Sequence, residues 1–527
     1  MNKEKIKLIQ MGESIRCIKY KAQPFCETQK ILGNNIDEKN KAYRLFMEGK
    51  SLYQKMKILL NSVGKSNQNT LYEQIMTLFK MYPLLEENTG IILIGEKCIG
   101  KSALYSLVFN EILHIHNGMP TVPELRGNAA KNSDAALLQE KVVILEELKG
   151  AMTGEINGVL ECLKNAMESK KFLLRNKDKT DTTTSFVLIG NHYGKFRSLK
   201  ELNRERLLEN FPECMQKEEA LFDRIPYLLP HYTSLTGEIF YAEPDSLGIP
   251  IEILSEYFLS IRNETLNFDL EGYKLQGREN RIYFKTIQGI AKMVAIDKVE
   301  SWFIEGILEF CKHFHSLLTS EKPYNPFNEK SAQFILELLG FNALEVNQCL
   351  FHEERILIQK KGENIFHKIA LTGYGIEQNQ VEYEWFQYLQ EEKYKRHFVP
   401  IIDLLDAGKE MIQEVGNTYS SKAIYPSGNR PKTDEDFNRL LIENIQNQVE
   451  ASYGKNKSLS IENTFRGIPK FYNRIAQSLI DEIFGVKAPV YKKNYFLRDS
   501  CIQFLNFSEF ISNKAIYNSE RNGKEEK

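Results

Sequence analysis

Short apolar runs alternate with longer helical patterns between about residues 89 and 235. Four runs of four or five apolar residues lie at 91–94, 142–145, 186–189 and 225–229. Continuous apolar runs of this length are typical of the buried strands of a parallel sheet that helices cover on both faces. The pattern therefore predicts an α/β fold for this part of the chain.

Helical periodicity flanks this region on both sides. Apolar residues recur at helix spacing between residues 45 and 79 and again between residues 250 and 320. Residues 1–88 carry 15 Lys and Arg against 9 Asp and Glu. We expect four parts: a basic, helical N-terminal region (1–88), an α/β domain (89–240), a helical subdomain (241–322) and a mixed α/β C-terminal domain (323–527).

Composition narrows the class of protein. Of the 527 residues, 42% are hydrophobic and 26% are charged, and the net charge is −1. These values are typical of globular proteins and exclude a global basic excess, so any nucleic-acid site must be local. The eight cysteines form no CxxC pair, and no apolar stretch is long enough to cross a membrane. We expect a cytoplasmic protein without a membrane partner.

The first candidate binding motif lies directly after the first apolar run. Residues 95–102 read GEKCIGKS and fit the phosphate-binding pattern GxxxxGK[ST], with Gly95, Gly100, Lys101 and Ser102 at its fixed positions. In such a loop backbone N–H groups surround a phosphate, the lysine meets the β and γ oxygens, and the hydroxyl binds Mg²⁺. We expect ATP and Mg²⁺ as ligands. Residues 103–113 continue as a helix, and 114–116 are expected to form its polar end.

Polar residues also end the next two apolar runs. Glu146 and Glu147 follow 142–145, and Asn191 follows 186–189. Next to a phosphate loop, the first carboxylate would hold the Mg²⁺ water shell and the second would polarise the attacking water. Asn191 would orient that water, although a strand-terminal Asn is more often a turn former. Arg224, directly before the fourth run, could reach the γ-phosphate of a neighbouring subunit, or form a surface pair with Asp223.

The order of these motifs resembles the AAA+ ATPases. The stretches 121–130, 142–150, 167–169, 186–191 and 221–225 look like the ATPase core of the Lon-like BrxL proteins of BREX phage-defence systems, which are related to the MCM helicases. Residues 277–279 and 286–292 stand where that family carries its second-sensor pattern, with Arg278 as the sensor candidate and Arg281 as its competitor. The resemblance covers residues 89 to 320. It implies an AAA+ core with a helical lid.

The resemblance also implies how the protein would act. A hexameric or double-hexameric ring would hold ATP at subunit interfaces, with Arg224 acting on a neighbour's nucleotide. The ring would encircle duplex DNA. Other defence proteins are possible partners. In such rings a hairpin between the acidic strand end and Asn191 projects into the pore. The cations that would then contact DNA phosphates are Lys170, Lys171, Arg175, Lys177 and Lys179.

Two departures and two alternatives accompany this hypothesis. Residues 325–527 show no Lon-type Ser and Lys dyad, and residues 1–88 do not read like the family's N-terminal region, so neither peptidase activity nor a DNA-binding front domain is expected. The main alternative is an ATP-dependent ring switch that recruits an effector through residues 323–527. A protein-threading remodeller is the weaker alternative, because the hairpin is basic rather than aromatic.

Overall fold

The computed structural model describes residues 43–414 with interruptions. The gaps are at 67–68, 103, 106–112, 118–119, 127–139, 147–152, 169, 174–178, 193, 210, 238–247, 250, 276 and 389–400. The described chain divides into two compact units. The first reaches to Glu345 and includes Leu371–Tyr374, and the second contains Val346–Ala370 and the described residues from Gly375 onward.

A five-stranded parallel sheet forms the centre of the first unit. Its order is β2-β3-β6-β1-β7, with every neighbouring pair parallel. The bounds are β1 (Gly90–Gly95), β2 (Leu113–Asn117), β3 (Val142–Glu146), β6 (Ser185–Asn191) and β7 (Tyr227–His231). All six residues of β1 are buried, as expected for a strand covered on both faces. The predicted α/β class is thus confirmed.

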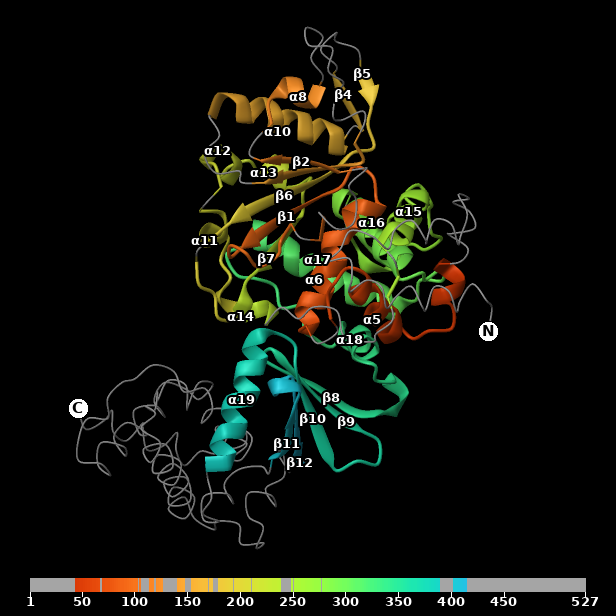
Figure 1. Cartoon of the computed structure of the whole chain (residues 1–527), viewed down its shortest axis with the longest axis vertical. Helices are drawn as coiled ribbons and strands as arrows, with labels where there is room; N and C mark the ends of the chain where they lie inside the picture. Colours follow the sequence, from red (N-terminus) through yellow and green to blue (C-terminus); the bar gives the residue numbers. More distant parts are fainter. Residues whose placement is uncertain are drawn as a thin grey trace, which may run out of the picture. The chain divides into compact units, whose positions relative to one another are not determined.

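Helices cover both faces of this sheet. Figure 1 shows α8 (Val122–Arg126) and α10 (Thr153–Glu168) on one side, and α6 (Leu71–Leu85) with α17 (Ser301–Thr319) on the other. Helix α6 contacts β1, β6 and β7, and α17 contacts β7. Short helices follow the last two strands: α11 (Arg204–Leu208), α12 (Glu213–Gln216) and α13 (Glu219–Phe222) lie between β6 and β7, and α14 (Thr233–Thr236) comes after β7.

The remaining helices of the first unit pack around α6 and α17. They are α5 (Leu52–Ser62), α15 (Ile251–Ser260), α16 (Gly277–Met293) and α18 (Ala332–Leu339). Helix α16 packs on both α6 and α17, and α18 packs on α5 and α17. Aromatic rings fill the contact between α6, β7 and α17: Phe79 meets Tyr227 edge-on at 5.4 Å and Phe314 at 4.8 Å.

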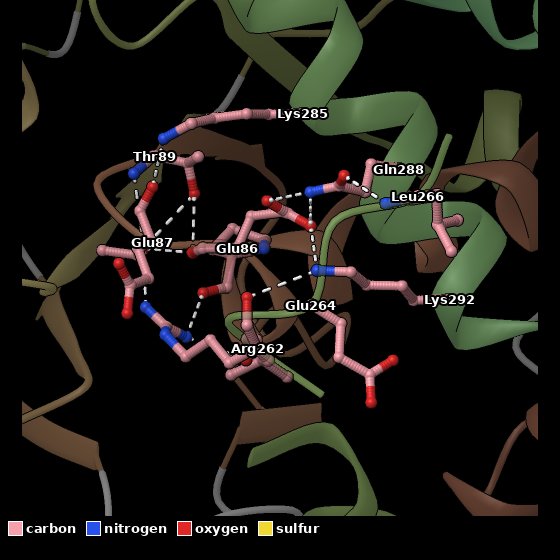
Figure 2. Close-up of polar contacts among 12 residues, drawn as sticks. Glu86, Glu87, Thr89, Arg262, Glu264, Leu266, Lys285, Gln288 and Lys292 are labelled. Atoms are coloured by element: carbon pink, nitrogen blue, oxygen red, sulfur yellow. Dashed lines mark hydrogen bonds and ion pairs between the residues drawn. The ribbon is translucent and has the colours of Figure 1, made fainter. Parts of the chain in front are cut away.

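Two buried charged residues join these helices to one another and to the strands (Figure 2). The Glu86 carboxylate after α6 accepts from Lys292 at 2.8 Å and from Gln288 at 2.9 and 3.0 Å, both on α16. Arg262, which follows α15, donates to five oxygens: Pro83 O, Leu84 O, Lys141 O, Thr183 O and Ser185 Oγ, at 2.8 to 3.0 Å. One guanidinium therefore holds the end of α6 and the starts of β3 and β6.

The second unit contains a five-stranded antiparallel sheet and one long helix. The sheet order is β11-β12-β10-β9-β8. Its elements are β8 (Val346–His352), β9 (Arg355–Lys360), β10 (Ile365–Ala370), α19 (Gly373–Tyr388) from Gly375 onward, β11 (Ile401–Leu405) and β12 (Glu410–Glu414). Glu382 of α19 accepts from Arg355 at 2.7 Å and from Lys368 at 2.8 Å, all three buried. The predicted mixed α/β character of this region is confirmed.

Two local expectations were wrong. Residues 114–116 are not the polar end of a helix but the middle of β2, which pairs with β3 from Leu113↔Val142 to Asn117↔Glu146. The fourth strand begins at Tyr227 rather than at Ile225. The N–H groups of Arg224 and Ile225 donate to Leu221 O at 2.9 and 2.8 Å, so these residues still close the helical turn after α13.

Across the ranges that the structure describes, every helix is too short or too polar to cross a bilayer.

Candidate functional site

The GEKCIGKS loop follows β1 without a break. β1 lies between β6 and β7 in the sheet, and Gly95 faces His231 O so closely that a Cβ atom there would lie 1.8 Å from that oxygen. Only glycine fits this approach. Cys98 and Gly100 then take left-handed backbone angles, with φ of 61° and 82°, and turn the chain sharply. The loop thus brings Lys101 back over the end of β1.

Lys101 lies inside this loop. Its side chain is largely buried, and its Nζ donates to Gly95 O and to Asn191 Oδ1, each at 3.0 Å, and to Glu96 O. Asn191 is the last residue of β6, paired in register with Gly95. Two predicted site residues that are 90 positions apart are therefore in direct contact. Ser102 is described next to Lys101 and is half-buried.

The pKa of Lys101 reflects its burial and the charges near it, including the carboxylate at the end of β3. Burial lowers the pKa of Lys101 to about 8, although Cys98, Glu96 and Glu146 raise it. Glu146 is the last residue of β3, at the same carboxyl edge of the sheet as Gly95 and Asn191. Glu147 lies outside the described residues. The site that can be described therefore contains a cation, a carboxylate and an amide at one edge of the sheet.

A buried charged cluster behind the loop was not predicted from the sequence. Glu73 and Lys80 of α6 lie 3.4 Å apart, and His231 at the end of β7 lies 3.3 Å from Glu73 and 3.4 Å from Lys80. Burial, and then Lys80, lowers the pKa of His231 to about 4, so the ring is neutral near pH 7. His231 is the residue whose backbone lies against Gly95, so this buried cluster packs behind the start of the loop. The spacing of Glu73 and Lys80 on one helix face was the only local signal.

The two predicted arginines lie near the amino-terminal ends of the parallel strands, opposite the carboxyl edge that holds Lys101. Arg224 and Arg278 line a cavity with Thr89, which directly precedes β1, whereas Lys101 contacts the last residue of that strand. The six residues of β1 extend about 20 Å. Neither arginine therefore lies beside Lys101 of its own chain. Arg278, which was expected among the nucleotide contacts, lies beside Arg224 in the lining of this cavity.

One carboxylate joins the two arginines. Glu168, the last residue of α10, accepts from Arg278 Nη2 at 2.7 Å and from Arg224 Nη2. Arg278 Nη1 also donates to Asp223 Oδ2 at 3.1 Å. The hydrogen bond from Arg224, and the nearby charges of both arginines, lower the pKa of Glu168. Glu168 lies in one of the stretches that resemble the family, but its pairing with Arg224 and Arg278 was not predicted, because the three residues are distant in sequence.

The basic segment forms a hairpin. β4 (Lys171–Leu173) pairs with β5 (Lys179–Asp181) in antiparallel register. Lys170 precedes it with a φ of 57°, and Lys170 and Lys171 are both exposed. Arg175 and Lys177 lie outside the described residues, and the side chain of Lys179 is not described.

The residues at the carboxyl edge fit a nucleotide with its metal. Within the described ranges, no group of three or more His, Cys, Asp or Glu could hold a metal ion alone. Mg²⁺ at nucleotide sites needs fewer protein ligands, since phosphate oxygens and waters fill its shell. Two protein oxygens, such as those predicted from Ser102 and Glu146, would be enough for Mg²⁺ in such a site, and the buried ammonium of Lys101 suits a polyphosphate.

Comparison with known proteins places this architecture in a family. The family described as "Lon-like protease BrxL-like, ATPase domain" matches residues 34–313. "Lon-like protease BrxL" of Bacillus cereus (strain H3081.97) is 25% identical over 224 residues, which are 41% of this chain and 32% of that protein. "Lon-like protease BrxL" of Escherichia coli O9:H4 (strain HS) is 26% identical over 248 residues, 46% of this chain and 35% of that protein.

These matches differ in extent. The chain spans about a third of the length of these curated relatives, at 32% and 35%. The family match covers more than half of the chain and includes the parallel sheet, its helical layers and most of α17. The chain therefore belongs to the BrxL-like family, through the ATPase domain of that family.

Proposed function

We propose that this protein is an ATP-hydrolysing AAA+ ring that acts on DNA in anti-phage defence. In this proposal Lys101 binds the β and γ phosphates, Ser102 and Glu146 hold Mg²⁺, Glu147 polarises the attacking water and Asn191 orients it. When bound there, Mg²⁺ would neutralise the charge that develops on the phosphates. Family membership supports ATP as the substrate.

The observation that carries the proposal is that the predicted site residues lie at opposite ends of the parallel strands of one sheet. Lys101 and Asn191 are at the carboxyl edge, and Arg224 and Arg278 are about one strand length away at the opposite edge. An arginine at that distance cannot stabilise charge on the nucleotide of its own subunit. If subunits associate head to tail, the arginine edge of one meets the nucleotide edge of the next. Both Arg224 and Arg278 would then act in trans.

Mixing two inactive variants tests this division. We expect Lys101→Ala and Arg224→Ala each to lack ATP turnover as uniform assemblies, because every site misses one component. In an equal mixture with random assembly, about one site in four combines an intact Lys101 with an intact Arg224. Turnover should therefore recover to about one quarter of the wild-type value, measured as phosphate release. A mixture as inactive as its components, although the subunits co-assemble, would contradict action in trans.

The hairpin supplies the expected contact with DNA. Lys170 and Lys171 are exposed cations at its base, and phosphate contacts of lysines make binding depend on salt. Replacing both by alanine should weaken duplex DNA binding and reduce the slope of log affinity against log salt by about 2 for each contacting subunit. Fluorescence anisotropy over a salt series measures both quantities.

A matched variant provides the control for the DNA experiment. Lys322 and Lys330 are exposed lysines of the first unit outside the hairpin, and replacing both changes the charge equally. Their replacement should leave the salt slope unchanged. If the wild-type protein binds no DNA, the better function is the ATP-dependent switch that recruits an effector through residues 323–527.

A further inference from the structure

Glu168 holds together two guanidinium groups that no local motif connects. Its two carboxylate oxygens are divided between Arg224 Nη2 and Arg278 Nη2, and the contact to Arg278 measures 2.7 Å. Arg224 precedes β7, Arg278 is in the first turn of α16 and Glu168 ends α10. Two guanidinium groups repel each other, and the shared carboxylate offsets that repulsion.

The surroundings of Glu168 are strongly cationic. A cavity of about 40 Å³ is lined by Arg224 and Arg278 and by three further cations, whereas its acidic lining is Glu168 and Asp223. The three further cations are Lys170, Arg281 and Lys285. Burial, together with the charges of Lys170 and Arg281, lowers the pKa of Lys285 to about 8, although Glu86 raises it. Such a recess favours an anion with several charges, such as the terminal phosphates of a nucleoside triphosphate.

Glu168 is also tied to the hairpin. Asn88 Nδ2 donates to Ala166 O at 2.9 Å and to Thr182 O at 2.7 Å, which joins the last turn of α10 to the residue after β5. Thr182 N donates to Lys170 O at 2.9 Å and closes the base of the hairpin. A displacement of the hairpin therefore moves the end of α10, and with it the Glu168 carboxylate.

We propose that Glu168 is a positioning residue, which holds Arg224 and Arg278 side by side toward the triphosphate of a neighbouring subunit and transmits the position of the hairpin to them. This inference rests on the proposed function. It assigns Glu168 no contact with the nucleotide. It makes the two arginines one phosphate-binding unit whose geometry depends on the hairpin.

The test compares Glu168→Gln with the wild type in the full-length, assembled protein. We expect kcat for ATP to fall about tenfold with KM within about twofold, since loss of the carboxylate disorders groups that act mainly in the transition state. Addition of duplex DNA should change kcat of the wild type and leave that of Glu168→Gln unchanged. Glu168→Asp, which keeps the charge, should recover part of the lost rate.

A control and a double variant separate positioning from general damage. Glu161→Gln removes an exposed carboxylate from the same helix, two turns earlier, and should retain wild-type kcat and the DNA response. In an Arg278→Ala background, Glu168→Gln should reduce kcat much less than it does alone, because the pair is already broken. Equal losses in both backgrounds would overturn the positioning role.

The remaining outcomes distinguish the inference from the proposed function. If Arg224→Ala keeps wild-type turnover in the same assay, action of the arginines in trans is wrong. If Arg224→Ala is inactive but Glu168→Gln turns over like the wild type, only the role of Glu168 is wrong. A wild-type kcat that does not respond to DNA would overturn the transmission from the hairpin.

Discussion

Replacement of Arg262 by alanine is expected to lower the free energy of unfolding by about 3 to 5 kcal/mol. The guanidinium is almost fully buried and donates to five oxygens, four of them backbone carbonyls. Truncation leaves these oxygens buried without their donor and opens a cavity between α6 and the sheet. Such a loss is a large part of the stability of most domains. Urea denaturation followed by tryptophan fluorescence and circular dichroism measures it.

Two variants calibrate this expectation. Arg44 makes ion pairs with Glu264 and Asp297, and its side chain is 36% exposed, so Arg44→Ala should cost less than about 1 kcal/mol. Arg262→Lys keeps the charge but has three donors for the five oxygens, so it should lie between the wild type and Arg262→Ala. A value for Arg262→Ala as small as that for Arg44→Ala would contradict the structural role.

Replacement of Lys101 by alanine is expected to lower kcat/KM for ATP roughly 100- to 1,000-fold. In the proposed function this ammonium is the cation that meets the β and γ phosphates. Its position is well defined, because Gly95 O and Asn191 Oδ1 each accept from it at 3.0 Å. Initial rates of phosphate release over a range of ATP concentrations measure the change.

The variant must be separated from damage to the loop. Lys101→Met retains the apolar stem of the side chain and should lose as much activity as Lys101→Ala. Lys97 is an exposed lysine of the same loop, and Lys97→Ala should stay within about twofold of the wild type. Full activity of Lys101→Met, with an unchanged unfolding midpoint, would exclude Lys101 from phosphate binding.

Much of the first unit was predictable because buried parallel strands are continuous apolar runs. β1, β3 and β6 lie where such runs were found. β2 was missed because β3 is its one neighbour among the strands that the structure describes, and its sequence LHIHN alternates polar and apolar residues. Pro230 is tolerated in β7 because β7 is the edge strand on the other side of the described sheet, where a missing N–H donor breaks no pairing.

The motifs of the candidate site were predictable from the sequence, but the separation of its residues between the two ends of the strands was not. The contact between Lys101 and Asn191 follows from strand ends that meet at one edge of a parallel sheet. The contact of Glu168 with Arg278 joins residues 110 positions apart, and neither flanking sequence indicates it. Arg262 likewise reads as an ordinary residue after a helix, because its partners are mostly backbone carbonyls. Backbone acceptors leave no pattern of side chains in a sequence.

Arg262 also bears on how the first unit folds. Its partners lie 77 to 179 positions earlier in the chain, at the end of α6 and at the starts of β3 and β6. One guanidinium can satisfy all of them only after the strands and the helices that follow them have come together. The strand-bearing part and the later helices are thus expected to fold cooperatively, as one unit of high contact order rather than as two independent modules. Any opening motion of the helices would then pivot at Arg262.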